Sequence, residues 1–142
     1  MDILYVGGPC AAREIELTRE DMAALEAKHR IEDVGSVAKG REGTAVKLEA
    51  LIDLAQPGVE TRFVHVASAD GGFTANVALD EARKGGVVLY RLGEDELPRK
   101  FGGPFRLLFA DGEDCSVNVK FLGRIELLAE EGTHTASCAD EG

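Results

Sequence analysis

Apolar residues recur with two different periods along this chain, and the periods divide it into helices and strands. Four apolar residues between 48 and 55 are spaced three or four apart, which predicts an amphipathic helix that ends before Pro57-Gly58. Thr18 precedes a turn rich in acidic residues and is a typical N-cap, so we expect a helix over about 19–28. The segment 79–85 predicts at most two helical turns.

The second half of the sequence is dominated by polar and apolar residues in alternation and by short apolar runs. Both patterns are typical of strands, and turn-forming residues separate them. The sequence predicts a hairpin of strands 62–67 and 73–79, joined by the turn 69–72. It also predicts a loop at 35–43, a polar turn at 93–98 and further strands at 13–17, 30–34, 87–92, 105–109, 116–121 and 123–128. Short helices combined with mixed or mostly antiparallel sheet predict an α+β fold.

The chain has 142 residues, which suits one domain whose core needs neither a metal nor a disulfide. We expect this domain over 1–129 and a disordered polar tail over 130–142. No apolar run is long enough to span a membrane and the N-terminus lacks signal-peptide features, so we expect a cytoplasmic location. Cys10, Cys115 and Cys138 form an odd, scattered set, which is typical of free thiols.

The formal net charge is −10, from 16 basic and 26 acidic residues. Nucleic acid requires a basic surface for its phosphates, so we expect no nucleic-acid partner. This balance still allows one small anionic ligand in a local basic pocket. It does not indicate an oligomeric state.

Arg106 interrupts the apolar run 105–109 and is a candidate for such a pocket. Strand periodicity places its side chain opposite to those of its apolar neighbours. The same periodicity places Ser116, Asn118 and Lys120 on one face of the next predicted strand. If the two strands pair, these side chains form a small cationic patch that suits a phosphate. A solvated outer face of the sheet explains the same pattern, and alternation alone favours that alternative.

Several short motifs resemble the molybdopterin-binding oxidoreductase domain of the sulfite oxidase family. They are Ser68-Ala69-Asp70-Gly71, Leu97-Pro98, Gly102-Gly103-Pro104-Phe105-Arg106-Leu107, Val119-Lys120-Phe121 and Ile125-Glu126-Leu127. The segments LYVGGPCAAREIELTREDMAAL and GTAVKLEALIDLA resemble the family's N-terminal half, so the resemblance covers about residues 3–128. It implies a sulfite oxidase-like fold with mixed or antiparallel sheets and short helices.

In that family, the arginine and the lysine of these motifs help to hold the pterin and its phosphate. The resemblance therefore implies that molybdopterin, or a related ligand, binds here. Glycines in such a motif let the backbone approach a ligand closely. The cofactor-binding residues that it implies lie in these motifs or beside them: Arg106, Lys120, Ser116, Asn118, Gly102 and Gly103.

The chain departs from the family where the metal is bound. The family's molybdenum-ligating cysteine corresponds approximately to Asp33 or Val34, in the segment RIEDVGSVAKGRE, which has no cysteine. A carboxylate is a poor substitute for a thiolate, so we do not expect bound molybdenum. Phe101 replaces the family's histidine before Gly-Gly-Pro, Phe121 its tryptophan after the lysine, and Gly72-Phe73 its tyrosine pattern after Asp-Gly.

Other reactive side chains have ordinary structural explanations. His65 lies within a predicted strand, and Asp70 is typical of a turn. Cys115 lies among acidic residues that raise a thiol pKa, and His134 and Cys138 form a pair without the second pair that a metal site needs. We therefore name no catalytic residue and no metal ligand.

Three functions remain as hypotheses. The first is a degenerate family member that binds a pterin-type or other small anionic ligand without molybdenum redox catalysis. The second is a non-enzymatic protein-interaction module on the same scaffold, which a cleft filled by Phe101, Phe121 or Phe73 would favour. The third is an active molybdenum oxidoreductase with altered metal ligation, which a yellow-brown colour would favour.

Overall fold

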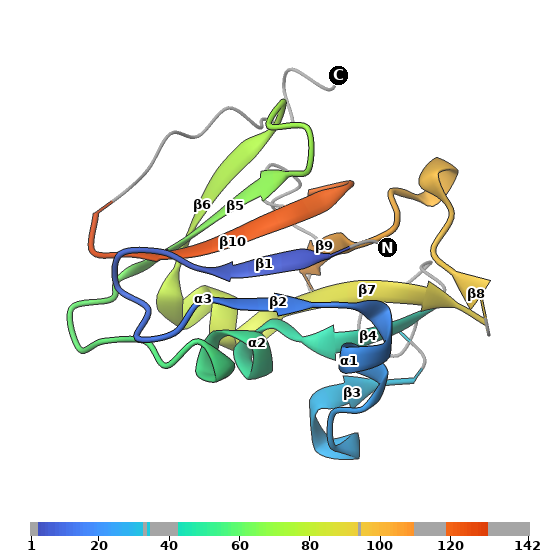
Figure 1. Cartoon of the computed structure of the whole chain (residues 1–142), viewed down its shortest axis with the longest axis horizontal. Helices are drawn as coiled ribbons and strands as arrows, with labels where there is room; N and C mark the ends of the chain where they lie inside the picture. Colours follow the sequence, from blue (N-terminus) through green and yellow to red (C-terminus); the bar gives the residue numbers. More distant parts are fainter. Residues whose placement is uncertain (1–2, 33, 35–42, 94, 110–118, 131–142) are drawn as a thin grey trace.

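The computed structural model describes residues 3–32, 34, 43–93, 95–109 and 119–130, which form two β-sheets and three short helices (Figure 1). The first sheet has the order β2 (Ile15–Leu17), β1 (Leu4–Gly7), β10 (Leu122–Leu128), β5 (Phe63–Ser68), β6 (Thr74–Ala78). The second has the order β3 (Arg30–Ile31), β4 (Thr44–Lys47), β7 (Gly86–Leu92), β8 (Asp95–Glu96), and β9 (Arg106–Phe109) also pairs with β7. The β1–β10 pair is parallel and the other described pairs are antiparallel, so the predicted α+β fold with mixed sheets is confirmed.

The main hydrophobic core lies between the two sheets and the helices α1 (Arg19–Ala23), α2 (Leu48–Leu54) and α3 (Leu79–Gly85). In Figure 1 the first sheet lies above the second, and the helices lie along the lower side. Each layer contributes fully buried residues, such as Ile125 from β10 and Leu107 from β9. A smaller second cluster covers part of the second sheet and consists of Val34, Ala45, Val87, Leu89, Leu97 and Leu108.

The three predicted helices are present, but the first is shorter than expected. Thr18 caps α1 as predicted: its hydroxyl accepts a hydrogen bond from Asp21 N, and the Asp21 carboxylate accepts one from Thr18 N. The helix ends at Ala23 instead of near residue 28, and a 3-10 turn, Ala27–His29, follows. Arg30 Nε donates to the Leu25 carbonyl oxygen at 3.0 Å. This side-chain contact fits a chain that has left the helix and turned into β3.

Most predicted strands are confirmed within two residues, including the β5–β6 hairpin. The strand predictions missed β1 and β4, and the predicted polar turn at 93–98 contains the short strand β8. The prediction of a strand over 116–121 is wrong at its end. Val119 forms an isolated bridge with Leu107, and the next two residues lie in a turn because Phe121 adopts a positive φ of 54°. Residues 116–118 lie outside the described residues.

Two further predictions, the loop at 35–43 and the tail at 130–142, fall mainly outside the described residues. The predicted domain boundary at 129 therefore stays a prediction. Among the helices that the structure describes, none is long and apolar enough to cross a membrane.

Candidate functional site

Gly102 brings the two predicted cations together. It follows a 3-10 turn, Arg99–Phe101, and has a positive φ of 90°, which glycine adopts without strain. A Cβ atom built on Gly102 would lie 2.9 Å from Arg106 Cδ and 2.9 Å from Lys120 Cγ. The aliphatic stems of both side chains therefore lie against the Gly102 α-carbon. We call Gly102, Arg106 and Lys120 the basic corner.

The backbone fixes the turn that carries Lys120. Phe121 N donates to the Gly102 carbonyl at 2.7 Å, and the Phe121 carbonyl accepts from Ala69 N at 2.6 Å. One residue later, Leu122 N donates to the Phe105 carbonyl at 2.8 Å. The turn is thus held between the Gly-Gly-Pro segment and the loop after β5. Lys120 reaches Arg106 from this turn, and not from the strand that periodicity predicted.

Arg106 is half-buried at the start of β9, on the side away from the main core. It pairs with Leu89 of β7. Leu89 and Leu108 are 3% and 1% exposed and belong to the second cluster, so this face of the sheet is apolar and covered around β9. The alternative of a solvated outer face is therefore wrong for β9. A cation at the margin of a covered apolar face lies in a lower dielectric than a surface cation, which strengthens its interaction with an anion.

A pocket of about 200 Å³ lies beside the basic corner. Its walls include the rings of Phe105, Phe121 and Pro104 and two charged side chains, Asp70 and Arg99. The Arg99 guanidinium lies 5.8 Å from the centroid of the Phe121 ring, within range of a cation–π contact. Apolar walls with a few charged groups are typical of small-ligand sites.

Asp70 is held in its turn by hydrogen bonds from the same loop. The Ser68 hydroxyl donates to Asp70 Oδ1 at 2.6 Å, and Gly72 N donates to the same oxygen at 2.9 Å. The Ser68 bond first, and the Gly72 bond second, lower the pKa of Asp70 below its usual value. The predicted turn role is confirmed, and the turn also sets a carboxylate at the pocket.

The other predicted site residues do not lie at the basic corner or are not described. Gly103 is buried, and a Cβ on it would overlap the Leu97 carbonyl, so packing alone accounts for this glycine. Ser116 and Asn118 lie outside the described residues. Sequence reasoning missed Arg99, although a basic residue three positions before Gly102, in LPRKFGGP, was a usable signal. His65 accepts or donates a hydrogen bond with Asn76 Oδ1 at 3.0 Å, as its structural role predicts.

The described residues offer no metal centre: among them, no group of three or more histidine, cysteine, aspartate or glutamate side chains could hold an ion. Val34, near the position of the family's cysteine, is fully buried in the second cluster. Cys10 is also buried, and this burial, more than the nearby Glu60 carboxylate, raises the pKa of its thiol. Asp33, Cys115, His134 and Cys138 lie outside the described residues.

The arrangement fits part of a molybdopterin. The stems of Arg106 and Lys120 pack closely against Gly102, so a phosphate would be bound by their charged ends and not between their stems. The adjoining pocket offers aromatic walls for a ring. The described residues do not supply the thiolate that would bind the metal.

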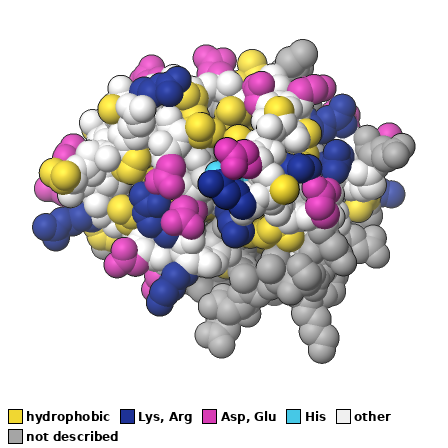
Figure 2. All heavy atoms as spheres, turned by 90° about the horizontal axis from the view of Figure 1, so that it is seen from below, with side chains coloured by type: hydrophobic (Ala, Val, Ile, Leu, Met, Phe, Trp, Pro, Cys, Tyr) yellow, Lys and Arg dark blue, Asp and Glu magenta, His cyan; other side chains and the backbone are white. Residues whose placement is uncertain are grey.

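Charge elsewhere does not suggest a polyanion site. Figure 2 shows the molecule from below, where basic and acidic side chains are interspersed over the described part of this face. Ion pairs such as Arg83 with Asp53 at 2.9 Å account for part of this mixing. The prediction that nucleic acid is not a partner stays a prediction.

Comparison with known proteins agrees with this geometry. The family model described as oxidoreductase molybdopterin binding domain matches residues 4–136. The crystal structure of the sulfane dehydrogenase SoxCD from Paracoccus pantotrophus has a similar fold, with a TM-score of 0.68 and 15% sequence identity. The match covers 91% of this chain but only 38% of that chain. No curated protein matches the sequence.

Proposed function

Because the chain belongs to the oxidoreductase molybdopterin-binding domain family, we propose that it binds a pterin-type or other small anionic ligand without the family's molybdenum redox catalysis. The observation that carries the proposal is the basic corner, where the stems of Arg106 and Lys120 meet over Gly102. Arg106 would bind a phosphate through its planar fork, and Lys120 would add a point charge.

The pocket beside the basic corner extends the proposal to the rest of the ligand. A ring would lie against Phe121, on which Arg99 already stacks at 5.8 Å. Asp70 is ionised at neutral pH because hydrogen bonds lower its pKa, so its carboxylate would accept N–H groups from the edge of the ring. The chain's own groups thus match a ligand with an anionic end and a hydrogen-bonding ring.

We propose no molybdenum catalysis because of where the chain's cysteine thiols lie. The segment that resembles the cysteine-bearing region of the family contains no cysteine. Val34 in that segment packs among aliphatic side chains, and the described thiol, Cys10, is buried with a raised pKa. A protonated thiol in an apolar environment is a poor metal ligand.

The test is the content of metal and pterin in protein purified from a host that makes the cofactor. Elemental analysis measures molybdenum, and fluorescence after acid release and oxidation measures the pterin. We expect pterin without stoichiometric molybdenum. The Arg106→Ala variant should lose the pterin, whereas Arg62→Ala, which removes an exposed arginine before β5, should keep it.

The outcomes separate the hypotheses. Stoichiometric molybdenum would contradict the non-catalytic part and favour an oxidoreductase with altered metal ligation. If neither component is found, and calorimetry detects no binding of pyrophosphate to the wild type, the ligand-binding proposal fails. The interaction module then becomes the better candidate.

A further inference from the structure

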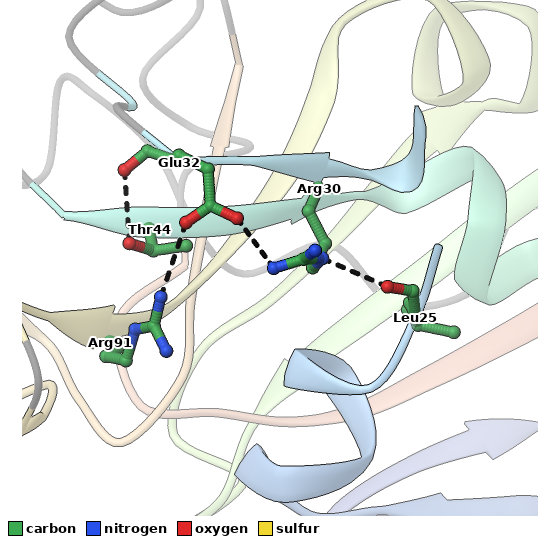
Figure 3. Close-up of polar contacts among 5 residues, drawn as sticks. All are labelled: Leu25, Arg30, Glu32, Thr44 and Arg91. Carbon is green, nitrogen blue, oxygen red and sulfur yellow. Dashed lines mark hydrogen bonds and ion pairs between the residues drawn. The ribbon is translucent and has the colours of Figure 1, made fainter. Parts of the chain in front are cut away.

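A second group of charged side chains lies on β3 and β7, away from the basic corner. Figure 3 shows Glu32 between two arginines: Arg30 Nη1 lies 2.6 Å from Glu32 Oε1, and Arg91 Nη2 lies 3.4 Å from Glu32 Oε2. Each carboxylate oxygen therefore faces a different guanidinium. The Glu32 carbonyl oxygen separately accepts a hydrogen bond from the Thr44 hydroxyl at 3.1 Å, which holds the backbone in place.

Burial within this group is uneven. The side chains of Arg30 and Arg91 are 25% and 28% exposed, whereas that of Glu32 is 61% exposed. The two cations are part of the protein wall, and the single anion between them lies on the solvent side. The Glu32 carboxylate can therefore rotate away from the two arginines into solvent. The two guanidinium groups would then repel each other, and another anion between them would relieve this repulsion.

A β-bulge directs two consecutive residues toward this group. Thr44 of β4 pairs with Arg91, but the next residue, Ala45, pairs with Leu89, so Tyr90 is an extra residue in β7. A bulge re-aims side chains and lets neighbours approach the same side of a sheet. Arg91 accordingly reaches Glu32, while its guanidinium also lies 5.6 Å from the Tyr90 ring centroid.

Two hydrogen-bond donors in this group lack an acceptor among the described residues. The Tyr90 side chain is fully buried, and its hydroxyl donates to no acceptor there, although Arg30 lies close enough to lower its pKa as a hydrogen-bond donor; Arg91 Nε is buried and makes no hydrogen bond there. Burial raises the pKa of Tyr90 more than Arg91 and Arg30 lower it, while Glu32 adds to the rise, so the hydroxyl keeps its proton at neutral pH. A buried donor without an acceptor destabilises the fold, so such donors are rare unless a ligand or a water molecule accepts their hydrogen bond.

We propose that Arg30, Arg91 and the Tyr90 hydroxyl form a carboxylate-binding subsite, which Glu32 fills as an internal ligand until a small carboxylate molecule replaces it. The side chain of Glu32 indicates the class of ligand, because it places one planar carboxylate between two guanidinium groups. A free carboxylate is not tied to the end of β3, so in the proposed complex it also accepts from the Tyr90 hydroxyl, which lacks an acceptor. The subsite is independent of the basic corner and adds a second ligand class.

The test uses Tyr90 as its own reporter. The chain has two tyrosines and no tryptophan, so in a Tyr5→Phe background the tyrosine absorption and fluorescence come from Tyr90 alone. Tyr5 lies on the first sheet and bonds Glu14, outside the proposed subsite. Chloride is replaced by sodium acetate at constant ionic strength. With Glu32→Ala added, we expect a saturable change in the Tyr90 signal, with acetate binding about tenfold tighter than with Glu32 intact.

Four controls define the subsite. Glu49→Ala removes a carboxylate of similar exposure that pairs with a single arginine, Arg83, at 3.5 Å, and it should not create acetate binding. Adding Arg91→Ala to the Glu32→Ala protein should abolish the response, whereas Arg106→Ala should leave it unchanged. Sulfate, which is tetrahedral, should bind more weakly than acetate.

The proposal is overturned if folded Glu32→Ala protein responds equally to acetate and chloride, if the response survives Arg91→Ala, or if sulfate binds more tightly than acetate. Circular dichroism establishes the fold of each variant. If Glu32→Ala does not fold, Glu32→Gln keeps the side-chain shape without the charge. It should then bind acetate more tightly than the Glu32 protein, and equal binding would overturn the proposal.

Discussion

The basic corner and the surroundings of Val34 have opposite chemical character. Two cationic side chains meet at the first, and aliphatic side chains pack together at the second. At the basic corner, the Gly-Gly-Pro-x-Arg and Val-Lys motifs keep their residues, and the structure brings Arg106 and Lys120 to one glycine. Near Val34, where the family has its metal-ligating cysteine, the described side chain is a fully buried aliphatic one. The first region carries two cations at one glycine, and the second contributes to a hydrophobic cluster.

If the proposed function is correct, ligand binding and metal chemistry are separable in such a scaffold. The basic corner depends on backbone geometry: Gly102, the turn at Lys120 and two short backbone hydrogen bonds. A metal site depends on one soft ligand at one position, so a single replacement removes it. The following variants test whether the two regions are independent. They are ordered by the size of the loss that we expect in stability and affinity.

Gly102→Ala should have the largest effect. The alanine would adopt a strained positive φ, and its Cβ would lie only 2.9 Å from Arg106 Cδ and Lys120 Cγ. We therefore expect the variant to lose about 3 kcal/mol of stability and to bind phosphate more weakly. Gly93→Ala is the matched control, because Gly93 has a φ of 65° with no atom within 4 Å of the added Cβ. It should cost about 1 kcal/mol and keep the affinity. Denaturant unfolding and calorimetry with pyrophosphate measure both quantities; equal losses in the two variants would contradict the proposed contact.

Val34→Ala should affect stability alone. The side chain is fully buried among Ala45, Leu89 and other aliphatic residues, so its truncation should cost about 2 kcal/mol. We expect an unchanged affinity for pyrophosphate in calorimetry, provided the measurement is made where the variant is folded. A large loss of affinity would show that the second cluster supports the basic corner and that the two regions are coupled.

Asp70→Asn should have the smallest effect, and the effect should depend on pH. The folded-state pKa of Asp70 is lowered, so the group stabilises the fold above its unfolded pKa of about 3.9 and loses this contribution as the pH falls through the folded value. The variant should therefore be slightly less stable than the wild type at pH 7. In thermal unfolding the two proteins should converge as the pH falls through the folded-state pKa of Asp70. A constant difference across this range would contradict the charged hydrogen bonds as its cause.

Local patterns predicted much of the fold. The capping residues at Thr18, the spacing of apolar residues in α2 and the turn between β5 and β6 are short-range signals, and the structure confirms each. The helix α1 was predicted too long: it ends at Ala23, and a separate 3-10 turn, Ala27–His29, occupies the end of the predicted range. β4 was missed because its four residues run directly into α2 without a turn.

The candidate site was predictable only in part. Motifs singled out Arg106, Lys120 and Gly102, but alternation placed Lys120 in a strand, and only the positive φ of Phe121 ends that pattern. Arg99 was missed although it lies three positions before Gly102, because its place in the wall of the pocket follows from tertiary contacts. The group around Glu32 depends on a bulge at Tyr90, and a bulge shifts register without any change in hydrophobic pattern.

The parallel pair β1–β10 has a consequence for synthesis of the protein. β10 lies at the centre of the first sheet, and it joins β1 and β2 to the β5–β6 hairpin. Until residues 122–128 have left the ribosome, the strand at Leu4–Gly7 lacks the neighbour that connects it to the rest of the sheet. Such long-range pairing slows folding and leaves strand edges open meanwhile. The nascent chain should therefore acquire protease resistance late and in one step, after β10 emerges.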